Sequence, residues 1–386
     1  MKRKICIITG TRAEYGLLSG LMRGIKNDSE LQLQVIATNM HLSPEFGLTY
    51  REIEADGFHI DKKVECLLSS DTSNGTSKTV GLAAIGFADA YEDLKPDLIV
   101  VLGDRYEILA AVQVALFYRI PIAHLHGGEI TEGAYDDCIR HAITKMSHLH
   151  FTSTEEYRQR VIQLGEQPDR IFNVGAIGVE NIKKIPLMSK KELEESIGFE
   201  MGDSCLMVTY HPVTLENNTA ERQSENLLTA LDQFKDCKII FTMPNSDTNG
   251  RIIKLTIEHY VAEKPYRCIA FKSLGLRRYL SALQYVKAVI GNSSSGIIEV
   301  PSFHIPTLNI GDRQKGRICA KSVIHCGTKK DEIEAGITTV LDDFFQNAAK
   351  NVSNPYEGKD TTAQILKVIK TYPLEDIIQK HFYDIR

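Results

Sequence analysis

The chain of 386 residues lacks a long apolar run, a CxxC pair and an excess of positive charge. Its basic start resembles that of a signal peptide, but the apolar run from Ile5 to Ile8 is short and is followed by Gly10 and Arg12. Neither a signal peptide nor a membrane span is therefore predicted. The net charge of −5 argues against a protein that sequesters nucleic acid. We expect a soluble cytoplasmic protein without membrane or nucleic-acid partners.

The eight cysteines are scattered, and several of them lie inside apolar, strand-like runs. This distribution predicts reduced core thiols and no disulfide framework. Neither an HxxxH motif nor a cluster of carboxylates occurs, so no metal site is expected. The dinucleotide fingerprint GxGxxG is missing from the first strand–helix turn, and no acidic residue marks the end of the second strand.

Short β-branched segments alternate with amphipathic helical stretches along the whole chain, which predicts an α/β fold with parallel sheets. Because the chain exceeds the size at which a single core keeps growing, two domains are expected. The Lys- and Glu-rich stretch from Asn181 to Gly202 is the predicted connection. It separates a first domain of residues 1–180, which the amphipathic C-terminal helices in 361–386 are expected to join, from a second domain of residues 181–360.

The expected strands of the first domain are Ile5 to Thr9, Leu33 to Thr38, Leu98 to Leu102, Ile122 to Leu125 and Ile171 to Val174. Those of the second domain are Leu206 to Thr209, Ile239 to Met243, Cys268 to Phe271, Ala288 to Ile290 and Thr307 to Ile310. In open α/β sheets, ligands bind beyond the carboxyl ends of the strands. The residues that follow each strand are therefore the candidates for binding and chemistry.

A serine-rich turn in the second half is the first candidate. One strand ends at Gly291, and a helical pattern that contains Glu299 follows three serines, Ser293, Ser294 and Ser295. Small residues let the backbone approach a ligand, and a helix N-terminus favours an anion. The turn therefore predicts a phosphate site, with Glu299 about 9 Å further along the helix axis and in reach of ribose hydroxyls. Helix capping by the serines is the alternative.

Polar residues also follow the strands of the first domain. Arg12 stands in the turn after the first strand, and Asp104 and Arg105 follow the strand that ends at Leu102. An arginine at a strand's carboxyl end suits a phosphate or a leaving group, although a solvated Arg12 is an equally simple interpretation. Asp104 suits acid–base chemistry or helix capping.

The next strand runs into the turn HLHGGE, which contains His126 and Glu129, and a helical segment then begins at Asp136. In a helix, Asp136 lies one turn from Arg140, so a surface ion-pair ladder is one interpretation of this segment. The ladder explains the helix but not the HLHGGE turn beside it in sequence. The turn therefore stays a candidate for chemistry.

Three more candidates follow strands of the second half. His211 closes one strand, Asn245 follows the next, and Arg313 lies in the segment after Ile310. A single histidine is usually structural. Its occurrence at a strand end, together with carboxylates and arginines at other strand ends, favours a site.

Short motifs occur in a fixed order along nearly the whole chain: GTRAEYG, LGDRYE, HLHGGE, DDCIRHAITKMSHLHFTS, TYHPVT, MPNSDTNG, IGNSSSGIIEVPS and NIGDRQKGR. Together they resemble the hydrolysing UDP-N-acetylglucosamine 2-epimerases of bacterial sialic acid synthesis. The resemblance implies a GT-B-like fold of two Rossmann-like domains whose parallel sheets face a central cleft, with the nucleotide held mainly by the second domain. It also implies conversion of UDP-N-acetylglucosamine to UDP and N-acetylmannosamine without a cofactor, in a homodimer or homotetramer.

The same resemblance implies roles for individual residues. Ser293 and Ser294, with Ser295 beside them, would bind phosphate, and Glu299 would bind the ribose. The remaining substrate or diphosphate ligands would be Arg12, Arg105, Asn245 and Arg313. The site histidine would be His211.

Acid–base chemistry falls to a second set of residues. In the α-linked sugar nucleotide the C1–O bond and the C2–H bond are axial on opposite faces, so a base can remove the C2 proton as UDP leaves and give a 2-acetamidoglucal. Water then adds at C1 while an acid protonates C2 from the other face, which requires two differently tuned groups. Asp104 and Asp136 match the family's acid–base candidates. Related epimerases carry a glutamate where this chain has His126, so His126 and Glu129 are both candidates for the remaining role.

Several alternatives share these motifs. An epimerase acting on UDP-2,4-diacetamido-2,4,6-trideoxyglucose, in the legionaminic acid pathway, is the nearest, although the segments around FTSTEEYRQRVIQLGE and PSFHIPTLNIGDRQKGR favour the sialic acid branch. A non-hydrolysing epimerase would release UDP-N-acetylmannosamine, and a glycosyltransferase would need an acceptor. The joint presence of Asp104, Asp136, Arg12 and His211 argues against an inactive nucleotide-sugar sensor.

Overall fold

The computed structural model describes residues 2–68, 70, 72–216, 218–245 and 247–385. By its internal packing the chain divides into two compact units. Unit 1 comprises Met1–Glu129, Asp136–Asn181 and Tyr356–Arg386, and unit 2 comprises Ile130–Tyr135 and Ile182–Pro355. Residues 130–135 fall within the predicted first domain in sequence, whereas they pack with unit 2.

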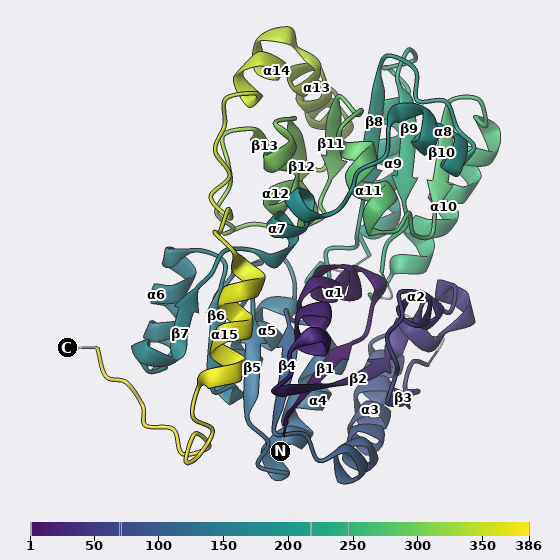
Figure 1. Cartoon of the computed structure of the whole chain (residues 1–386). Coiled ribbons are helices and arrows are strands. Elements are labelled where there is room, and N and C mark those ends of the chain that lie inside the picture. The colour runs from purple at the N-terminus through teal and green to yellow at the C-terminus, as the bar shows by residue number, and fades with distance from the viewer. Residues whose placement is uncertain (1, 69, 71, 217, 246, 386) are drawn as a thin grey trace. The chain divides into compact units, whose positions relative to one another are not determined.

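Unit 1 contains a parallel sheet with the strand order β3-β2-β1-β4-β5-β6-β7 (Figure 1). Its strands are β1 (Arg3–Thr9), β2 (Leu31–Thr38), β3 (Lys62–Val64), β4 (Leu98–Leu102), β5 (Ile122–Leu125), β6 (Leu149–Thr152) and β7 (Ile171–Asn173). Its helices are α1 (Arg12–Asn27), α2 (Tyr50–Ala55), α3 (Ser73–Leu94), α4 (Tyr106–Phe117), α5 (Asp136–Met146), α6 (Glu155–Gln163) and α15 (Thr361–Thr371), and α7 (Ile177–Lys184) runs across the boundary to unit 2.

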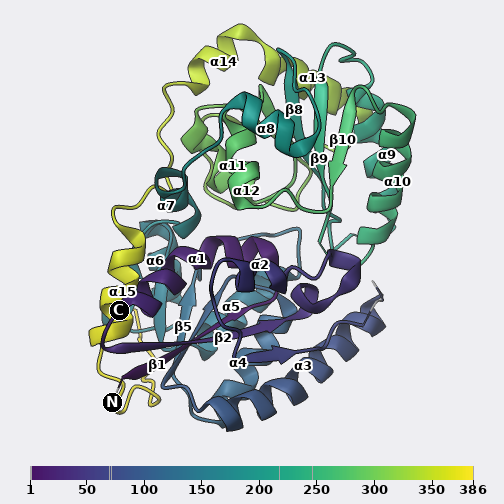
Figure 2. The same ribbon diagram turned by 45° about the vertical axis from the view of Figure 1, so that its right-hand side comes forward.

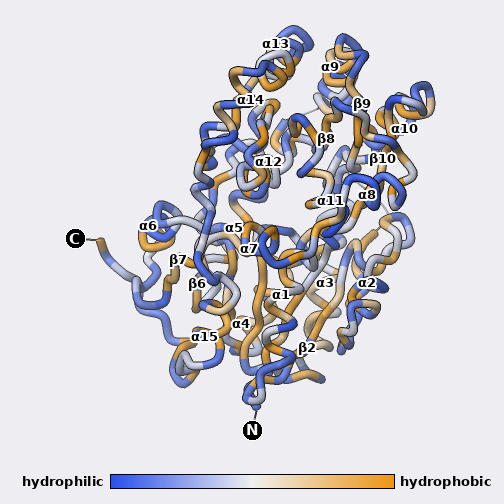
Figure 3. Tube along the Cα trace, turned by 45° about the horizontal axis from the view of Figure 1, so that its top comes forward, coloured by the Kyte–Doolittle hydropathy of each residue, from blue (hydrophilic) through white to orange (hydrophobic). Residues whose placement is uncertain are grey.

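The sheet of unit 1 is covered on both faces. Successive side chains of a strand point to opposite faces, so Ile5 and Ile7 of β1 pack in the cluster that contains residues of α1 and α15, whereas Cys6 and Ile8 pack with residues of α3 and α4. The hydrophobic colour in Figure 3 accordingly follows the strands of this unit. Burial on both faces explains why these strands read as continuous apolar runs in the sequence.

Unit 2 contains a second parallel sheet, with the order β10-β9-β8-β11-β12-β13. Its strands are β8 (Cys205–Thr209), β9 (Lys238–Thr242), β10 (Cys268–Phe271), β11 (Ala288–Gly291), β12 (Thr307–Ile310) and β13 (Val323–Cys326). Its helices are α8 (Lys190–Ile197), α9 (Ala220–Leu231), α10 (Gly250–Glu263), α11 (Leu276–Leu283), α12 (Ser295–Ile298), α13 (Lys330–Leu341) and α14 (Asp343–Ala349). The predicted parallel α/β architecture is confirmed, and every strand expected from the sequence is found to within two residues at either end.

Three expectations are wrong in detail. Only one helix, α15, forms in 361–385, because Pro373 ends it and the following segment is held by other contacts: Lys380 pairs with buried Glu166 at 2.6 Å. The helix after the serines is only four residues long, and a 3₁₀ helix, η4 (Val300–Phe303), follows it. Pro301 has no N–H to continue the α-helical pattern. Cys138 is exposed, whereas most of the other free thiols are buried.

None of the helices in the described ranges combines the length and hydropathy needed to cross a bilayer.

Candidate active site

In each sheet, the chain adds strands first on one side of the initial strand and then on its other side. In unit 2, β9 and β10 extend from one side of β8, and β11 then pairs with the other side of β8. In unit 1, β2 and β3 lie on one side of β1 and β4 lies on the other. Ligands of open α/β sheets bind at the carboxyl ends of the strands at such a switch point. The residues after β8 and β11, and those after β1 and β4, are thus the expected binding residues.

At the switch point of unit 2, Asn292 joins the ends of β8 and β11. Its wholly buried side chain donates from Nδ2 to the carbonyl oxygen of His211 at 2.8 Å, and its Oδ1 accepts from the N–H of His211 at 2.7 Å. Its carbonyl oxygen also accepts from Gln314 Nε2 at 3.0 Å. Asn292 therefore fixes His211, the serine turn and the segment after β12 relative to one another. Asn292 is not among the site residues predicted from the sequence, because only the folded chain shows these partners.

Gly291 makes this turn possible. Its φ is 134°, and a Cβ atom at this position would lie 1.9 Å from the carbonyl oxygen of Thr209 on the neighbouring strand. Such a contact is impossible for any side chain, so only glycine permits the two strands to end this close together.

The three serines are half-buried. Within the described part of the chain, the backbone N–H groups of Ser293 and Ser294 have no hydrogen-bond partner. Ser295 differs because its hydroxyl accepts from the Tyr279 hydroxyl at 2.8 Å. Glu299 ends α12 and begins η4, so the predicted position along a longer helix is wrong. The turn can bind an anion through its backbone N–H groups and its serine hydroxyl groups.

The other predicted residues of unit 2 follow the strands on either side. The N–H of Asn245, after β9, donates to Nδ1 of His211 at 3.4 Å. Because Nδ1 accepts, the neutral imidazole carries its proton on Nε2. Arg313, after β12, is buried and lies 3.6 Å from the buried carboxylate of Asp247. A buried carboxylate of this kind orients the planar guanidinium.

At the switch point of unit 1, the turn after β1 is closed by Glu14. Its Oε2 accepts from the N–H groups of Gly10 and Thr11 at 2.7 and 3.0 Å, and its own N–H donates to the Thr11 hydroxyl at 3.2 Å. This capping box starts α1 at Arg12. Burial, and then the carboxylate of Glu107, raise the pKa of Glu14 to about 8.

Glu107 lies under the same turn and is fully buried. Its Oε1 is 3.1 Å from Nε of Arg105, and a Cβ atom at Gly10 would lie 2.4 Å from that oxygen. Arg105 is thereby held at the carboxyl end of β4. Arg12 makes a different contact, since its Nε lies 2.7 Å from Glu52 of α2. The two predicted arginines thus lie at the carboxyl edge of the same sheet. Arg12 pairs with Glu52, and Arg105 pairs with Glu107.

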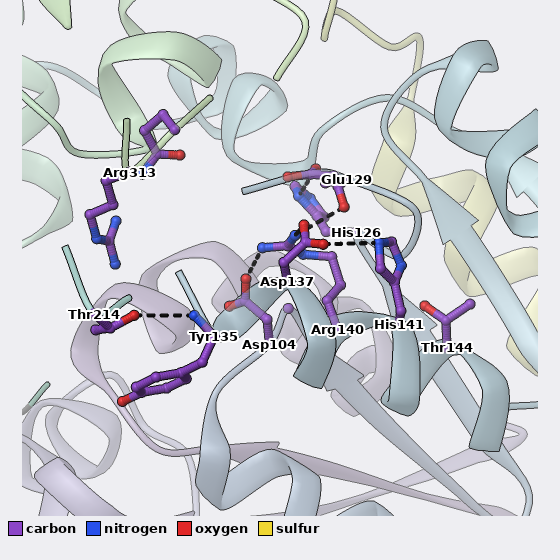
Figure 4. A network of polar contacts seen from close by, with 12 residues as sticks. Asp104, His126, Glu129, Tyr135, Asp137, Arg140, His141, Thr144, Thr214 and Arg313 are labelled. Carbon is purple, nitrogen blue, oxygen red and sulfur yellow. Dashed lines mark hydrogen bonds and ion pairs between the residues drawn. The ribbon is translucent and has the colours of Figure 1, made fainter. Parts of the chain in front are cut away.

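Asp104 is not a helix cap, because α4 begins after Arg105 without a side-chain cap. Its carboxylate instead pairs with Arg140 of α5 (Figure 4). Arg140 is fully buried, and it also donates to the carbonyl oxygen of Glu129 at 2.9 Å and to Asp137 at 3.4 Å. The surface-ladder interpretation of this helix is therefore wrong for Arg140, since this arginine is buried and contacts Asp104, Asp137 and the Glu129 carbonyl. Arg140 is not among the site residues predicted from the sequence.

The side chains of His126 and Glu129 contact each other in the HLHGGE turn. Nδ1 of His126 lies 3.0 Å from Oε1 of Glu129, and the Ser153 hydroxyl donates to the same oxygen at 2.8 Å. Both side chains are buried, and His126 has a left-handed φ of 66°. The carboxylate fixes the orientation of the imidazole ring. The pair can accept or release a proton as a unit.

Asp136 and Asp137 begin α5, where the helix dipole favours carboxylates. Both are half-buried, and Asp137 lies 3.5 Å from Nε2 of His141. His124, at the end of β5, has another function: burial lowers its pKa to about 3, and its ring contacts the carbonyl oxygen of Gly103 at 2.7 Å and the Thr144 hydroxyl at 3.1 Å. His124 therefore holds the end of β4 in its neutral form.

Unit 1 thus brings Asp104, His126 and Glu129 into one network through Arg140, and unit 2 brings His211, Asn245 and the serines together through Asn292. Among the described residues, no group of three or more His, Cys, Asp or Glu side chains is arranged to hold a metal ion.

The profile of the family described as UDP-N-acetylglucosamine 2-epimerase matches residues 23–370 of the chain. A hydrolysing GDP/UDP-N,N′-diacetylbacillosamine 2-epimerase from Campylobacter jejuni is 44% identical over 384 residues, which cover 100% of both chains. Polysialic acid biosynthesis protein P7 from Escherichia coli is 39% identical over 385 residues, covering 99% of this chain and 98% of the relative.

Among solved structures, the UDP-GlcNAc 2-epimerase from Neisseria meningitidis bound to UDP-GlcNAc superimposes with a TM-score of 0.78 at 16% identity, covering 95% of this chain and 99% of that one. At this identity the similarity concerns the fold. The GT-B-like fold with two parallel-sheet α/β units is thereby confirmed.

Proposed function

We propose a substrate and an assignment of roles for this chain, which belongs to the UDP-N-acetylglucosamine 2-epimerase family and is a hydrolysing UDP-sugar 2-epimerase. The reaction proposed is the conversion of a UDP-linked 2-acetamido sugar and water into UDP and the free 2-epimer. The observation that carries the proposal is the network of Asp104, Arg140, Glu129 and His126 at the carboxyl ends of β4 and β5, in which every member but the half-buried Asp104 is buried. It supplies acid–base groups of different character, as an elimination followed by a hydration requires.

The nucleotide is proposed to bind unit 2. The backbone N–H groups of Ser293 and Ser294 suit phosphate oxygens, and the glycine turn lets them approach closely. Arg313 and His211 would stabilise the charge that develops on UDP as the C1–O bond breaks. Glu299, the proposed ribose ligand, follows the same turn along the chain.

Asp104 is the proposed base that removes the C2 proton. Its pairing with Arg140 favours the ionised carboxylate, which is the form that accepts a proton. His126, in contact with Glu129, is the proposed acid that gives a proton to C2 as water adds at C1. Asp136, at the start of α5, is the second candidate for either role. Arg12 and Arg105 would bind the substrate's charged groups.

Two substrates fit this chemistry, since they differ only at C4 and C6 of the sugar. The sequence motifs favoured UDP-N-acetylglucosamine and the sialic acid branch. The relative named for diacetylbacillosamine nucleotides is, however, more similar to this chain than the polysialic acid protein, at 44% against 39% identity. We therefore place UDP-2,4-diacetamido-2,4,6-trideoxyglucose first and UDP-N-acetylglucosamine second, in both cases for the synthesis of a sialic-acid-like sugar.

Proton NMR in deuterated water tests the reaction and the substrate together. Each sugar nucleotide is incubated with the wild-type protein and with Asp104→Asn. The expected result is UDP and a free 2-epimer deuterated at C2, faster from the diacetamido substrate and slower by about 10²-fold in the variant. A deuterated UDP-linked 2-epimer would contradict the hydrolytic outcome, and faster turnover of UDP-N-acetylglucosamine would reverse the order of substrates.

A homodimer or homotetramer is also proposed. Helices α3 and α4 pack side by side (Figure 2), and each carries an exposed large apolar side chain: Ile85 of α3 is 66% exposed and Phe117 of α4 is 78% exposed. Large apolar side chains exposed together are typical of a protein–protein contact. Light scattering after gel filtration should give more than one chain per particle, and Ile85→Lys with Phe117→Lys should reduce it to one.

A further inference from the structure

The segment Ile130–Tyr135 lies, in the chain, between the acid–base candidates Glu129 and Asp136, yet it packs with unit 2. We call it the strap. Two of its residues, Thr131 and Ala134, are almost fully buried, and the N–H of Ala134 closes a turn onto the carbonyl oxygen of Thr131 at 3.0 Å. The strap is thus an ordered turn rather than a loose connection.

One side of the strap binds the segment after β12. The N–H of Glu132 donates to the carbonyl oxygen of Lys315 at 3.0 Å. A Cβ atom at Gly133 would lie 2.4 Å from the carbonyl oxygen of Asp312 and 2.9 Å from Cα of Arg313. Backbone atoms cannot yield as the end of a flexible side chain can, so any residue larger than glycine at position 133 displaces the strap from the Arg313 segment.

The other side of the strap binds the segment after β8. The N–H of Tyr135 donates to the Thr214 hydroxyl at 3.1 Å (Figure 4), and the N–H of Leu215 donates to the carbonyl oxygen of Gly133 at 3.4 Å. Thr214 is three residues after His211. The strap therefore contacts the two segments of unit 2 that carry the proposed diphosphate ligands His211 and Arg313.

The ends of the strap determine what it can do. Asp136 directly follows Tyr135, whose N–H is bonded to Thr214, and Glu129 lies two residues before the buried Thr131. The backbone positions of Glu129 and Asp136 therefore depend on where the strap is held. From this geometry we infer that Gly133 and Thr214 are positioning residues, which couple occupation of the nucleotide site in unit 2 to the placement of Glu129 and Asp136. The inference rests on the proposed function, since that gives acid–base roles to Asp136 and to His126, the partner of Glu129.

The experiment compares Gly133→Ala and Thr214→Val with two matched controls. Thr214→Ser keeps the hydroxyl that accepts from Tyr135. Glu132→Gln removes an exposed pair with Lys315, in which the charges lie 3.6 Å apart and both side chains are more than half exposed, so little effect is expected. For every protein, kcat and KM are measured, with UDP affinity by calorimetry and hydrogen–deuterium exchange of the peptide containing residues 129–136 with and without UDP.

The expected result is a loss of kcat of roughly tenfold to 100-fold in Gly133→Ala and Thr214→Val, with UDP affinity within about threefold of wild type. Both variants should also lose the UDP-induced protection of the strap peptide, and Thr214→Ser and Glu132→Gln should retain kcat and protection. Unchanged kcat in both variants, or UDP affinity that falls in proportion to kcat, would overturn the coupling.

The exchange measurement separates this inference from the proposed function. If the wild-type protein binds UDP but converts neither sugar nucleotide, the proposed function fails. UDP-dependent protection of the strap that disappears in Thr214→Val and remains in Thr214→Ser would then still support the coupling. Absence of UDP-dependent protection in the wild-type protein would overturn it.

Discussion

The switch points of the two units consist of different kinds of chemical group. That of unit 1 contains paired charged side chains, in which a fully buried member contacts a half-buried one: Arg140 pairs with Asp104, and Glu107 pairs with Arg105. That of unit 2 consists of a glycine turn, an asparagine that bonds to backbone atoms, and half-buried serines. The pKa values of charged side chains can be adjusted for proton transfer by their surroundings. A backbone turn instead fixes the positions of the N–H groups that bind a phosphate. Substitutions should therefore affect chemistry in unit 1 and nucleotide affinity in unit 2.

The largest effect expected is on catalysis in unit 1. Asp104→Asn and Asp136→Asn should each lower kcat by about 10²-fold, because each removes a carboxylate that transfers or stabilises a proton. UDP affinity, measured by calorimetry, should stay within about threefold of wild type. A combined loss of less than tenfold in the double variant would contradict the acid–base assignment and the division between the units.

The second effect is on the turn of unit 2. Gly291→Ala should lower the free energy of unfolding by at least about 1–3 kcal/mol and abolish measurable UDP binding, because its Cβ atom would overlap the Thr209 carbonyl. Denaturant unfolding and calorimetry measure the two quantities. Gly81→Ala in α3 is the matched control, since nothing lies within 4 Å of its Cβ position, and it should increase stability by about 0.5–1 kcal/mol. Nucleotide binding that survives in Gly291→Ala would show that the turn is not the phosphate site.

The third effect is a pH dependence that belongs to unit 1. Glu14 has a pKa raised from 4.5 to about 8 in the folded protein, so the folded state binds a proton that the unfolded state has already released between these values. The stability contributed by protonated Glu14 is therefore complete below about pH 4.5 and is lost as the pH rises towards 8.

Glu14→Gln cannot titrate, and so the difference in unfolding free energy between wild type and variant should shift in favour of the variant from pH 5 to pH 8. Urea unfolding at four pH values measures it. A difference that stays constant with pH would show that Glu14 is ionised in the fold.

The smallest effect concerns the pair of Arg12 and Glu52, in which the carboxylate is partly exposed. Glu52→Gln should change stability by no more than about 1 kcal/mol. It should also strengthen substrate binding a few-fold, because Arg12 would no longer be shared with a carboxylate when an anion arrives. A KM that rises instead would indicate that Glu52 positions Arg12 for the substrate.

Much of the fold follows from local patterns. The buried strands are continuous apolar runs that end in glycine or polar residues, so their positions and the residues after them could be read directly. The premature end of α12 could also have been predicted, because Pro301 is visible in the sequence and cannot continue a helix.

The partners of the site residues could not be predicted in the same way. Arg140 appears on a charged helix face in the sequence, and its burial depends on Asp104 and on the Glu129 carbonyl, which are distant along the chain. The strap has the composition of an ordinary loop, and only the contacts of Gly133 with the Arg313 segment reveal its role. Tertiary contacts of this kind leave no periodic signal.

The chain passes from one unit to the other four times, after residues 129, 135, 181 and 355. The final return brings α15 onto α1, where Ile365 and Ile369 are buried with Leu18 and Leu21. Dividing the chain after residue 181 would therefore leave both units incomplete. A fragment of residues 1–181 would lack the helix that covers α1, and the remainder would lack the strap. Truncation or domain-swap experiments on this enzyme should therefore use the whole chain as the unit of exchange.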